Sequence, residues 1–240
     1  MKSISPLIVK FSAILGLLGI PACSYHKPLP PGPCGEDPRR ELAECVRRKP
    51  ELAVMFVGNS YTFGVPKAFS KLSAARGKKV RVGHSAHGGW TLARHAGHDA
   101  TLRKIREGRW DVVVFQEQSE IPALSPGRRA AAMFPPLREL TTEARQEGAI
   151  PVLYQTWGRR YGDKRRKHDD FHAMTSRVRA GYQAAATNAG RLAVVPVGDF
   201  WEREVSAGRG EALFMPDGSH PTERGNQLTA EAFYETIFGK

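Results

Sequence analysis

Three residues of this chain have the types and spacing for acyl transfer by a serine nucleophile. Ser60 follows the apolar run at 54–57, which predicts a strand, so its hydroxyl is expected at a strand end. A serine hydroxyl attacks a carbonyl carbon only when a base takes its proton. His220 can be that base, and Asp217 can hold its other ring nitrogen because residues i and i+3 of one turn share a face. An ordinary surface turn is the alternative for Asp217 and His220, since Asp-Gly is common in turns.

Acyl transfer also needs hydrogen-bond donors aimed at the oxyanion of the tetrahedral intermediate. Besides the backbone N–H of Ser60, the sequence offers the N–H of Gly89 in a Gly-Gly pair and the side-chain amide of Gln116 or Gln118. Gln116 is preferred because it falls at the expected end of a strand. Taken separately, paired glycines and strand-end glutamines are ordinary turn and surface residues. Their coincidence with a serine and a histidine is what predicts an active site.

These residues require elements that bring them to one edge of the fold. Short apolar runs alternate with longer amphipathic ones along the chain. Strands are predicted over 52–57, 80–84, 110–116, 150–155 and 192–197, and helices over 67–76, 92–107, 128–147, 171–188 and 225–238. Such an alternation predicts an α/β fold with a parallel sheet covered on both faces. Ligands of these sheets bind at the carboxyl ends of the strands, where Ser60 and Gln116 fall.

Residues 1–22 are predicted to be a cleaved signal peptide, with a retained membrane anchor as the alternative. A weakly cationic start precedes an apolar run at 11–20 that is too short to span a bilayer and ends at Pro21-Ala22-Cys23. The order of residues 18–23 resembles a bacterial lipoprotein processing site, from which Pro21 departs. Lipidation of Cys23 would attach the protein to a membrane, and simple secretion is the alternative. The expected location is therefore the bacterial cell envelope or the medium outside it.

Residues 23–50 are expected to form an N-terminal tether, because four prolines lie within 25–33. Lipidation of Cys23 would leave Cys34 and Cys45 to form a disulfide in an oxidising compartment, with two free thiols as the alternative. Residues 51–240 are expected to form one catalytic domain, since a chain of 240 residues that is 41% apolar can bury a single sizeable core.

The net charge of +12 does not by itself identify a partner. The densest basic run, 159–167, has no nucleic-acid motif or aromatic stacking platform beside it, so no nucleic-acid partner is expected. We expect a solvated loop there, and contact with an anionic substrate or envelope polymer is the lesser alternative. Three aromatic residues lie near predicted strand ends: Trp90, Tyr154 and Trp157. We expect them to lie in the core, and a platform that binds a sugar is the alternative.

Two His-x-x-His pairs invite a rival hypothesis of a zinc or other transition-metal site. They are His84 with His87 and His95 with His98. This spacing commonly arises without a metal, so the expectation is that the protein uses no metal and no cofactor.

Over nearly the whole chain, about 52–238, these motifs resemble those of the SGNH/GDSL hydrolase superfamily. Its serine block is matched by Gly-Asn-Ser-Tyr-Thr at 58–62, with Asn59 in place of the common aspartate. Its glycine block is matched at 88–92 and its histidine block at 217–221. The third block departs from the usual Gly-x-Asn-Asp, and residues 110–119 resemble branches in which a strand-end glutamine replaces the asparagine.

The resemblance implies a three-layer α/β/α, flavodoxin-like domain over 51–240, with about five parallel strands and no metal. It also implies hydrolysis of a carboxylic ester through an acyl-Ser60 intermediate, with His220 as the base and a glutamine helping the amides of Ser60 and Gly89 to hold the oxyanion. Members often remove acetyl groups from carbohydrates, so a small-molecule or carbohydrate ester is the expected substrate. An acyltransferase of the same fold and a noncatalytic lipoprotein that binds envelope glycans remain the alternatives.

Overall fold

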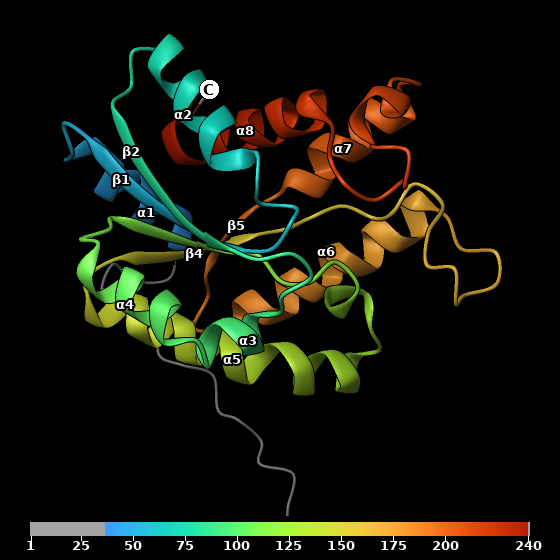
Figure 1. Ribbon diagram of the computed structural model, residues 1–240, viewed down its shortest axis with the longest axis horizontal. Coiled ribbons are helices and arrows are strands. Elements are labelled where there is room, and N and C mark those ends of the chain that lie inside the picture. The colour runs from blue at the N-terminus through green and yellow to red at the C-terminus, as the bar shows by residue number, and fades with distance from the viewer. Residues whose placement is uncertain (1–36, 240) are drawn as a thin grey trace, which may run out of the picture.

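The computed structural model describes residues 37–239 (Figure 1). The predicted signal peptide over 1–22 and the lipidation site Cys23 lie outside the described residues. So does Cys34, and with it the predicted disulfide to Cys45. Within 37–239 no helix is both long enough and apolar enough to cross a membrane.

A five-stranded parallel sheet forms the middle layer, with the strand order β2-β1-β3-β4-β5. The strands are β1 (Leu52–Gly58), β2 (Val80–Ala86), β3 (Val112–Phe115), β4 (Ile150–Tyr154) and β5 (Ala193–Val195). Every residue of β1 and β3 is buried, as expected for parallel strands covered on both faces. The chain moves from β1 to β2 on one side and then crosses to β3 on the other side. In sheets of this kind, ligands bind at the carboxyl ends of the strands where the order reverses, which are β1 and β3 here.

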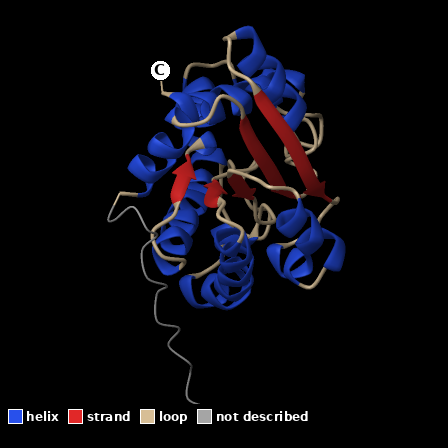
Figure 2. Ribbon diagram, turned by 90° about the vertical axis from the view of Figure 1, so that its left-hand side faces the viewer, coloured by secondary structure: helices blue, strands red, loops and turns tan. Residues whose placement is uncertain are grey.

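Helices cover both faces of the sheet, as Figure 1 and Figure 2 show. One face carries α1 (Pro38–Arg47), α2 (Val65–Ala75), α7 (Val197–Ser206) and α8 (Glu223–Phe238). The other face carries α3 (Leu92–Ala96), α4 (Asp99–Glu107), α5 (Pro126–Gln146) and α6 (Phe171–Asn188). Single 3-10 turns, η1 (Ile121–Ala123) and η2 (Gly210–Leu213), complete the described elements. The predicted α/β fold with a five-stranded parallel sheet between two helical layers is confirmed.

Alternate side chains of β1 enter the two hydrophobic cores, because successive residues of a strand point to opposite faces. Phe56 packs against Phe69 of α2 and Phe233 of α8, with ring centroids 6.1 and 5.2 Å apart. Met55 and Val57 enter the opposite core. Full burial of a side chain such as Phe56 contributes about 2 to 3 kcal/mol to folding. The strand that leads to Ser60 is thus anchored from both faces.

Helix α1 lies within the segment 23–50 that we expected to be a tether. Asp37 caps its first turn by accepting the N–H of Arg39, and Leu42 is buried against the core that α8 covers. The folded domain therefore begins before residue 51. The composition hides this helix, because charged residues surround its one buried leucine.

The helix predicted over 92–107 is two helices. Helix α3 ends at Ala96 with Gly97 as its C-cap, and His98 adopts an extended conformation before α4 begins. Helix α7, over Val197–Ser206, was not predicted, because its start overlaps the apolar run that we assigned to the last strand. The other predicted helices and strands are present, and none of their ends is shifted by more than two residues.

Candidate active site

Ser60 and His220 come together at the carboxyl edge of the sheet, although they lie near opposite ends of the chain. Ser60 is in the turn between β1 and α2, and its Oγ is 2.9 Å from Nε2 of His220. His220 immediately precedes α8, which Thr222 caps by accepting the N–H of Gly225. The starts of α2 and α8 approach closely at Gly64, where a Cβ atom would lie 2.4 Å from Nδ2 of Asn226. The distance between the hydroxyl and the imidazole suits proton transfer.

Asp217 orients His220 within a tight turn. One carboxylate oxygen of Asp217 accepts a hydrogen bond from Nδ1 of His220, and the other accepts the backbone N–H groups of Ser219 at 2.8 Å and His220 at 3.0 Å. Partial burial favours a higher pKa for Asp217, but these hydrogen bonds lower that pKa to about 2. The carboxylate stays ionised at neutral pH and holds the proton on Nδ1. Nε2 is then free to accept the proton of Ser60.

A stack of three aromatic rings packs against the turn that carries Asp217 and His220. The ring of Tyr61 stacks on Trp157 at 4.8 Å and meets His220 edge-on at 5.5 Å, and Trp157 stacks on Trp201 at 3.7 Å. The hydroxyl of Tyr61 is 2.5 Å from Oγ of Ser219, and the indole N–H of Trp157 donates to the carbonyl of Ser219 at 3.1 Å. Trp157 is completely buried. It therefore belongs to the core, and we had not anticipated that it would contact the turn that carries Asp217 and His220.

The other two aromatic candidates differ in accessibility. Tyr154 is completely buried, and its hydroxyl donates to the carbonyl of Tyr61 at 3.3 Å. Trp90 is partly exposed and stacks on the ring of His87 at 4.1 Å. The sugar-platform alternative is thus wrong for Tyr154 and Trp157, because burial keeps both rings from a ligand.

The glycine loop after β2 lies beside the Ser60 turn. Gly89 has φ +71, a left-handed conformation that glycine adopts without strain. The carbonyl of Trp90 accepts a hydrogen bond from Nδ2 of Asn59 at 3.0 Å, and the N–H of His87 donates to the carbonyl of Gly58 at 3.2 Å. Asn59, to which we gave no role, therefore ties the loop to the nucleophile's turn. The sequence feature that could have indicated this role is the position of Asn59 directly before Ser60.

Gln116 lies beneath the nucleophile's turn, and its carboxamide is engaged with the protein itself. Oε1 accepts the backbone N–H of Asn59 at 2.8 Å and the hydroxyl of Thr62 at 3.0 Å. Nε2 donates to the carbonyl of Glu117 at 2.5 Å, and the residue is only 1% exposed. The geometry thus makes Gln116 a brace for the turn that presents Ser60.

Gln118 has the freer amide. Its Oε1 accepts the N–H of Glu120 at 2.8 Å, whereas its NH₂ group donates no hydrogen bond within residues 37–239. The residue is partly exposed at the same edge of the sheet. Both predicted glutamines therefore follow β3, but only the amide of Gln118 is left open to a ligand.

The histidine pairs that suggested a metal site include His95, whose ring is hydrogen-bonded within the fold. His95 is buried, with Nε2 2.8 Å from the carbonyl of Gly58 and Nδ1 3.1 Å from Oγ1 of Thr101. Burial lowers the pKa of His95 to about 4 and so keeps the ring neutral. Within 37–239 no group of three or more His, Cys, Asp or Glu residues is arranged to hold a metal ion.

The basic run at 159–167 is partly neutralised by carboxylates. Arg159 and Arg165 both pair with Glu120, at 2.7 and 3.1 Å, and Arg165 also pairs with Asp163 at 2.9 Å. The backbone N–H of Arg160 donates to the carbonyl of Gly218 at 2.8 Å. The run therefore packs beside the Asp217 turn and is not merely a solvated loop.

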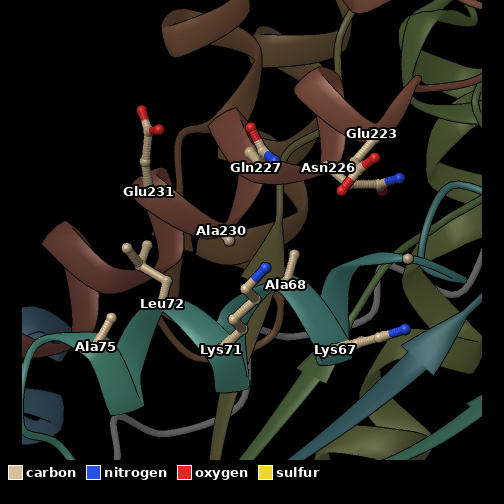
Figure 3. Close-up of a pocket in the computed structure, with 11 residues that line it drawn as sticks. Lys67, Ala68, Lys71, Leu72, Ala75, Glu223, Asn226, Gln227, Ala230 and Glu231 are labelled. Atoms are coloured by element: carbon tan, nitrogen blue, oxygen red, sulfur yellow. The ribbon is translucent and has the colours of Figure 1, made fainter.

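The predicted catalytic residues His220 and Asp217 are accessible. The side chain of His220 is 43% exposed and that of Asp217 is 48% exposed. A separate groove of about 720 Å³ lies between α2 and α8. Figure 3 shows Lys67 and Lys71 on its α2 side and Glu223 and Glu231 on its α8 side. Neither Ser60 nor His220 lines this groove. Ser60, the predicted nucleophile, instead lies partly exposed at the carboxyl edge of the sheet.

Solved structures with similar folds include several esterases, whereas neither a protein-family model nor a curated protein matches the chain. A DUF4886 family protein from Bacteroides uniformis is 17% identical with a TM-score of 0.70, over 79% of this chain and 84% of that one. A proposed GDSL-like lipase from Parabacteroides merdae is 15% identical with a TM-score of 0.57, over 80% and 98%. Axe2, an acetylxylan esterase from Geobacillus stearothermophilus, is 16% identical with a TM-score of 0.60, over 79% and 95%.

These similarities confirm the resemblance at the level of the fold. The chain has the three-layer α/β/α fold of the SGNH/GDSL hydrolases. At these identities the likeness shows the fold and not the activity, and the glutamine-containing third block remains a prediction.

Proposed function

We propose that this protein is a serine esterase that hydrolyses a carboxylic ester, and that its reaction is the O-deacetylation of a carbohydrate or cell-envelope polymer. The observation that carries the proposal is the line of hydrogen bonds from Ser60 through His220 to Asp217 at the carboxyl edge of the sheet. This arrangement has the parts needed to make a serine hydroxyl nucleophilic.

In the proposed reaction, Nε2 of His220 takes the proton of Ser60 as Oγ attacks the acyl carbon. The tetrahedral intermediate collapses to an acyl-Ser60, and His220 gives the proton to the departing alkoxide. Water then attacks the acyl group, its proton passes to His220, and the acid leaves as Ser60 regains its proton. Asp217 keeps its charge throughout and stabilises the imidazolium that forms in each half-reaction.

We propose three donors for the oxyanion: the backbone N–H groups of Ser60 and Gly89 and the NH₂ group of Gln118. Gln118 replaces our preferred Gln116, because the amide of Gln116 donates to the carbonyl of Glu117 and its oxygen faces the Asn59 N–H. Preorganised donors of this kind contribute about 3 kcal/mol each to transition-state stabilisation.

The open site supports a polymeric or carbohydrate substrate. A bulky polymer can reach a nucleophile at an exposed edge, whereas a deep cleft would require a free end or a small ligand. The structural similarity to an acetylxylan esterase supports an acetyl group on a sugar. Export, either as a lipoprotein through Cys23 or as a secreted protein, would place the enzyme near envelope polymers.

Acetate release from 4-nitrophenyl acetate and from acetylated xylan tests this proposal. We expect the wild-type protein to release acetate and Ser60→Ala to release none above the rate without enzyme. A serine-directed phosphonate should label Ser60, as located by mass spectrometry. Full acetate release by Ser60→Ala would overturn the serine mechanism. Acetyl transfer to an added saccharide would identify the acyltransferase, and glycan binding without turnover would identify the noncatalytic alternative.

A further inference from the structure

Glu117 is a buried acid with a contact to both candidate oxyanion segments. Its Oε1 accepts the backbone N–H of Gln118 at 2.6 Å and the backbone N–H of Leu92 at 3.1 Å. Leu92 is the first residue of α3 and lies three positions after Gly89 in the glycine loop. One carboxylate oxygen thus joins the segment that presents Gly89 to the segment that presents Gln118.

The backbone of Glu117 is fixed as well. Its N–H donates to the hydroxyl of Tyr182 in α6 at 3.0 Å, and its carbonyl accepts Nε2 of Gln116 at 2.5 Å. The residue is 0% exposed, and Oε2 has no hydrogen-bond partner within residues 37–239. A buried carboxylate oxygen without a partner is unfavourable for folding. Burial of the Glu117 side chain therefore lowers the stability of the fold by an amount that its hydrogen bonds do not fully offset.

We propose that Glu117 is a positioning residue for the oxyanion site, and that its ionised carboxylate holds the loop of Gly89 and the amide of Gln118 in register for turnover. This inference rests on the proposed esterase function. Charge strengthens both hydrogen bonds, because an ionised acceptor binds an N–H about twice as strongly as a neutral one. Protonation of Glu117 loosens both contacts, although the fold keeps the residue in place.

The surroundings of Glu117 make its ionisation sensitive to pH near neutrality. Burial raises the pKa of Glu117 to about 7, and the N–H groups of Gln118 and Leu92 act in the opposite direction. Tyr182, which faces it from α6, has a pKa raised by burial and stays neutral. The other titratable groups of the adjoining elements are engaged elsewhere: His95 with Gly58, Arg94 over Trp90, and Glu120 with Arg159.

A comparison of the wild type with Glu117→Gln tests the proposal, because glutamine keeps an acceptor oxygen but cannot ionise. The ratio of the two kcat values at each pH cancels any pH dependence that the two proteins share. We expect a ratio of about ten at about pH 8.5 that falls toward one at about pH 5.5, with KM unchanged. The matched control is Glu107→Gln, an exposed residue at the end of α4, which should give a ratio of one throughout.

A ratio that is constant with pH, or a change in KM alone, overturns the positioning role. Circular dichroism at both pH values checks that the variants are folded. Should Glu117→Gln fail to fold, Glu117→Asp serves instead, since it keeps the charge but is too short to reach both N–H groups. It should lose kcat while keeping the wild-type pH dependence, and an undiminished kcat overturns the proposal. Absence of Ser60-dependent turnover in the wild type would reject the esterase function itself, whereas turnover with a flat ratio rejects only the role of Glu117.

Discussion

Oε1 of Gln116 accepts the backbone N–H of Asn59 at 2.8 Å, directly before the nucleophile. The same oxygen accepts the hydroxyl of Thr62, two residues after Ser60. One buried carboxamide at the end of β3 therefore holds both sides of the turn that ends β1. The structure therefore assigns Gln116 to holding the Ser60 turn, and leaves Gln118 as the candidate donor to the oxyanion. The sequence alone did not distinguish these two roles.

Ser60→Ala should abolish esterase activity and leave the fold intact. The hydroxyl is the bond-forming group, and Ser60 is only partly buried, so removing one oxygen should change the free energy of unfolding by about 0.5 kcal/mol or less. Acetate release and a urea titration measure the two effects. A loss of activity that accompanies unfolding would attribute the result to structure instead of chemistry.

Asp217→Asn should lower kcat by about 10³-fold or more with little change in KM. The carboxamide nitrogen can donate to Nδ1 of His220, which favours the tautomer that has its proton on Nε2 and cannot accept the proton of Ser60. Steady-state kinetics with 4-nitrophenyl acetate measures the change. A decrease below tenfold would show that Asp217 does not set the tautomer.

The two glutamines should respond differently to replacement by alanine. Gln118→Ala should lower kcat by about 10²-fold or more, because it removes an NH₂ group that donates no hydrogen bond within residues 37–239. Its effect on the free energy of unfolding should be about 1 kcal/mol or less, because the variant loses only the bond from the N–H of the partly exposed Glu120. Gln116→Ala should lower the free energy of unfolding by about 2 kcal/mol, because it leaves the buried N–H of Asn59 without an acceptor. Kinetics and urea unfolding on both variants separate the roles. The reverse pattern would restore Gln116 as the oxyanion donor.

The stability of the wild type relative to Glu117→Gln should depend on pH. The folded-state pKa of Glu117 is about 7, above its ordinary value of 4.5, so the folded protein binds the proton more tightly than the unfolded chain. The wild type is therefore most stable, relative to the variant, below about pH 4.5 and loses that stability as the pH rises to about 7. The change should be on the order of 3 kcal/mol, measured by urea unfolding. Parallel stability curves would contradict the raised pKa.

Gly89→Ala should reduce kcat more than it reduces stability. Alanine at a φ of +71 is strained by about 1 to 2 kcal/mol, although no atom lies within 4 Å of the position its Cβ would occupy. Relief of that strain would turn the N–H of residue 89 away from the oxyanion. Gly127→Ala, also in open space but without a positive φ, is the matched control.

The sheet was predictable because parallel strands covered on both faces are continuous apolar runs, as in β1 and β3. Helix α1 was not predictable in this way, since its single buried residue, Leu42, produces no apolar periodicity. Helix α7 follows β5 with only Pro196 between them, so one apolar run contains the end of a strand and the start of a helix.

Some residues of the candidate site were likewise predictable from the sequence and others were not. The positions of Ser60, Asp217 and His220 follow from what acyl transfer requires of residue types and spacing. The choice between Gln116 and Gln118 does not, because strand alternation ends at Phe115 and the later side chains follow the local turns. The roles of Asn59 and Glu117 depend on contacts with the loop after β2, which no spacing along the chain encodes.

The Ser60–His220 pair spans 160 positions of the sequence, and its base lies just before the last helix. A nascent chain that has folded β1 and α2 holds its nucleophile without a base until α8 docks onto α2. In the proposed mechanism, the nucleophile and its base therefore come together only when α8 is docked onto α2. Under the proposed esterase function, turnover would then report that helix α8 is in place.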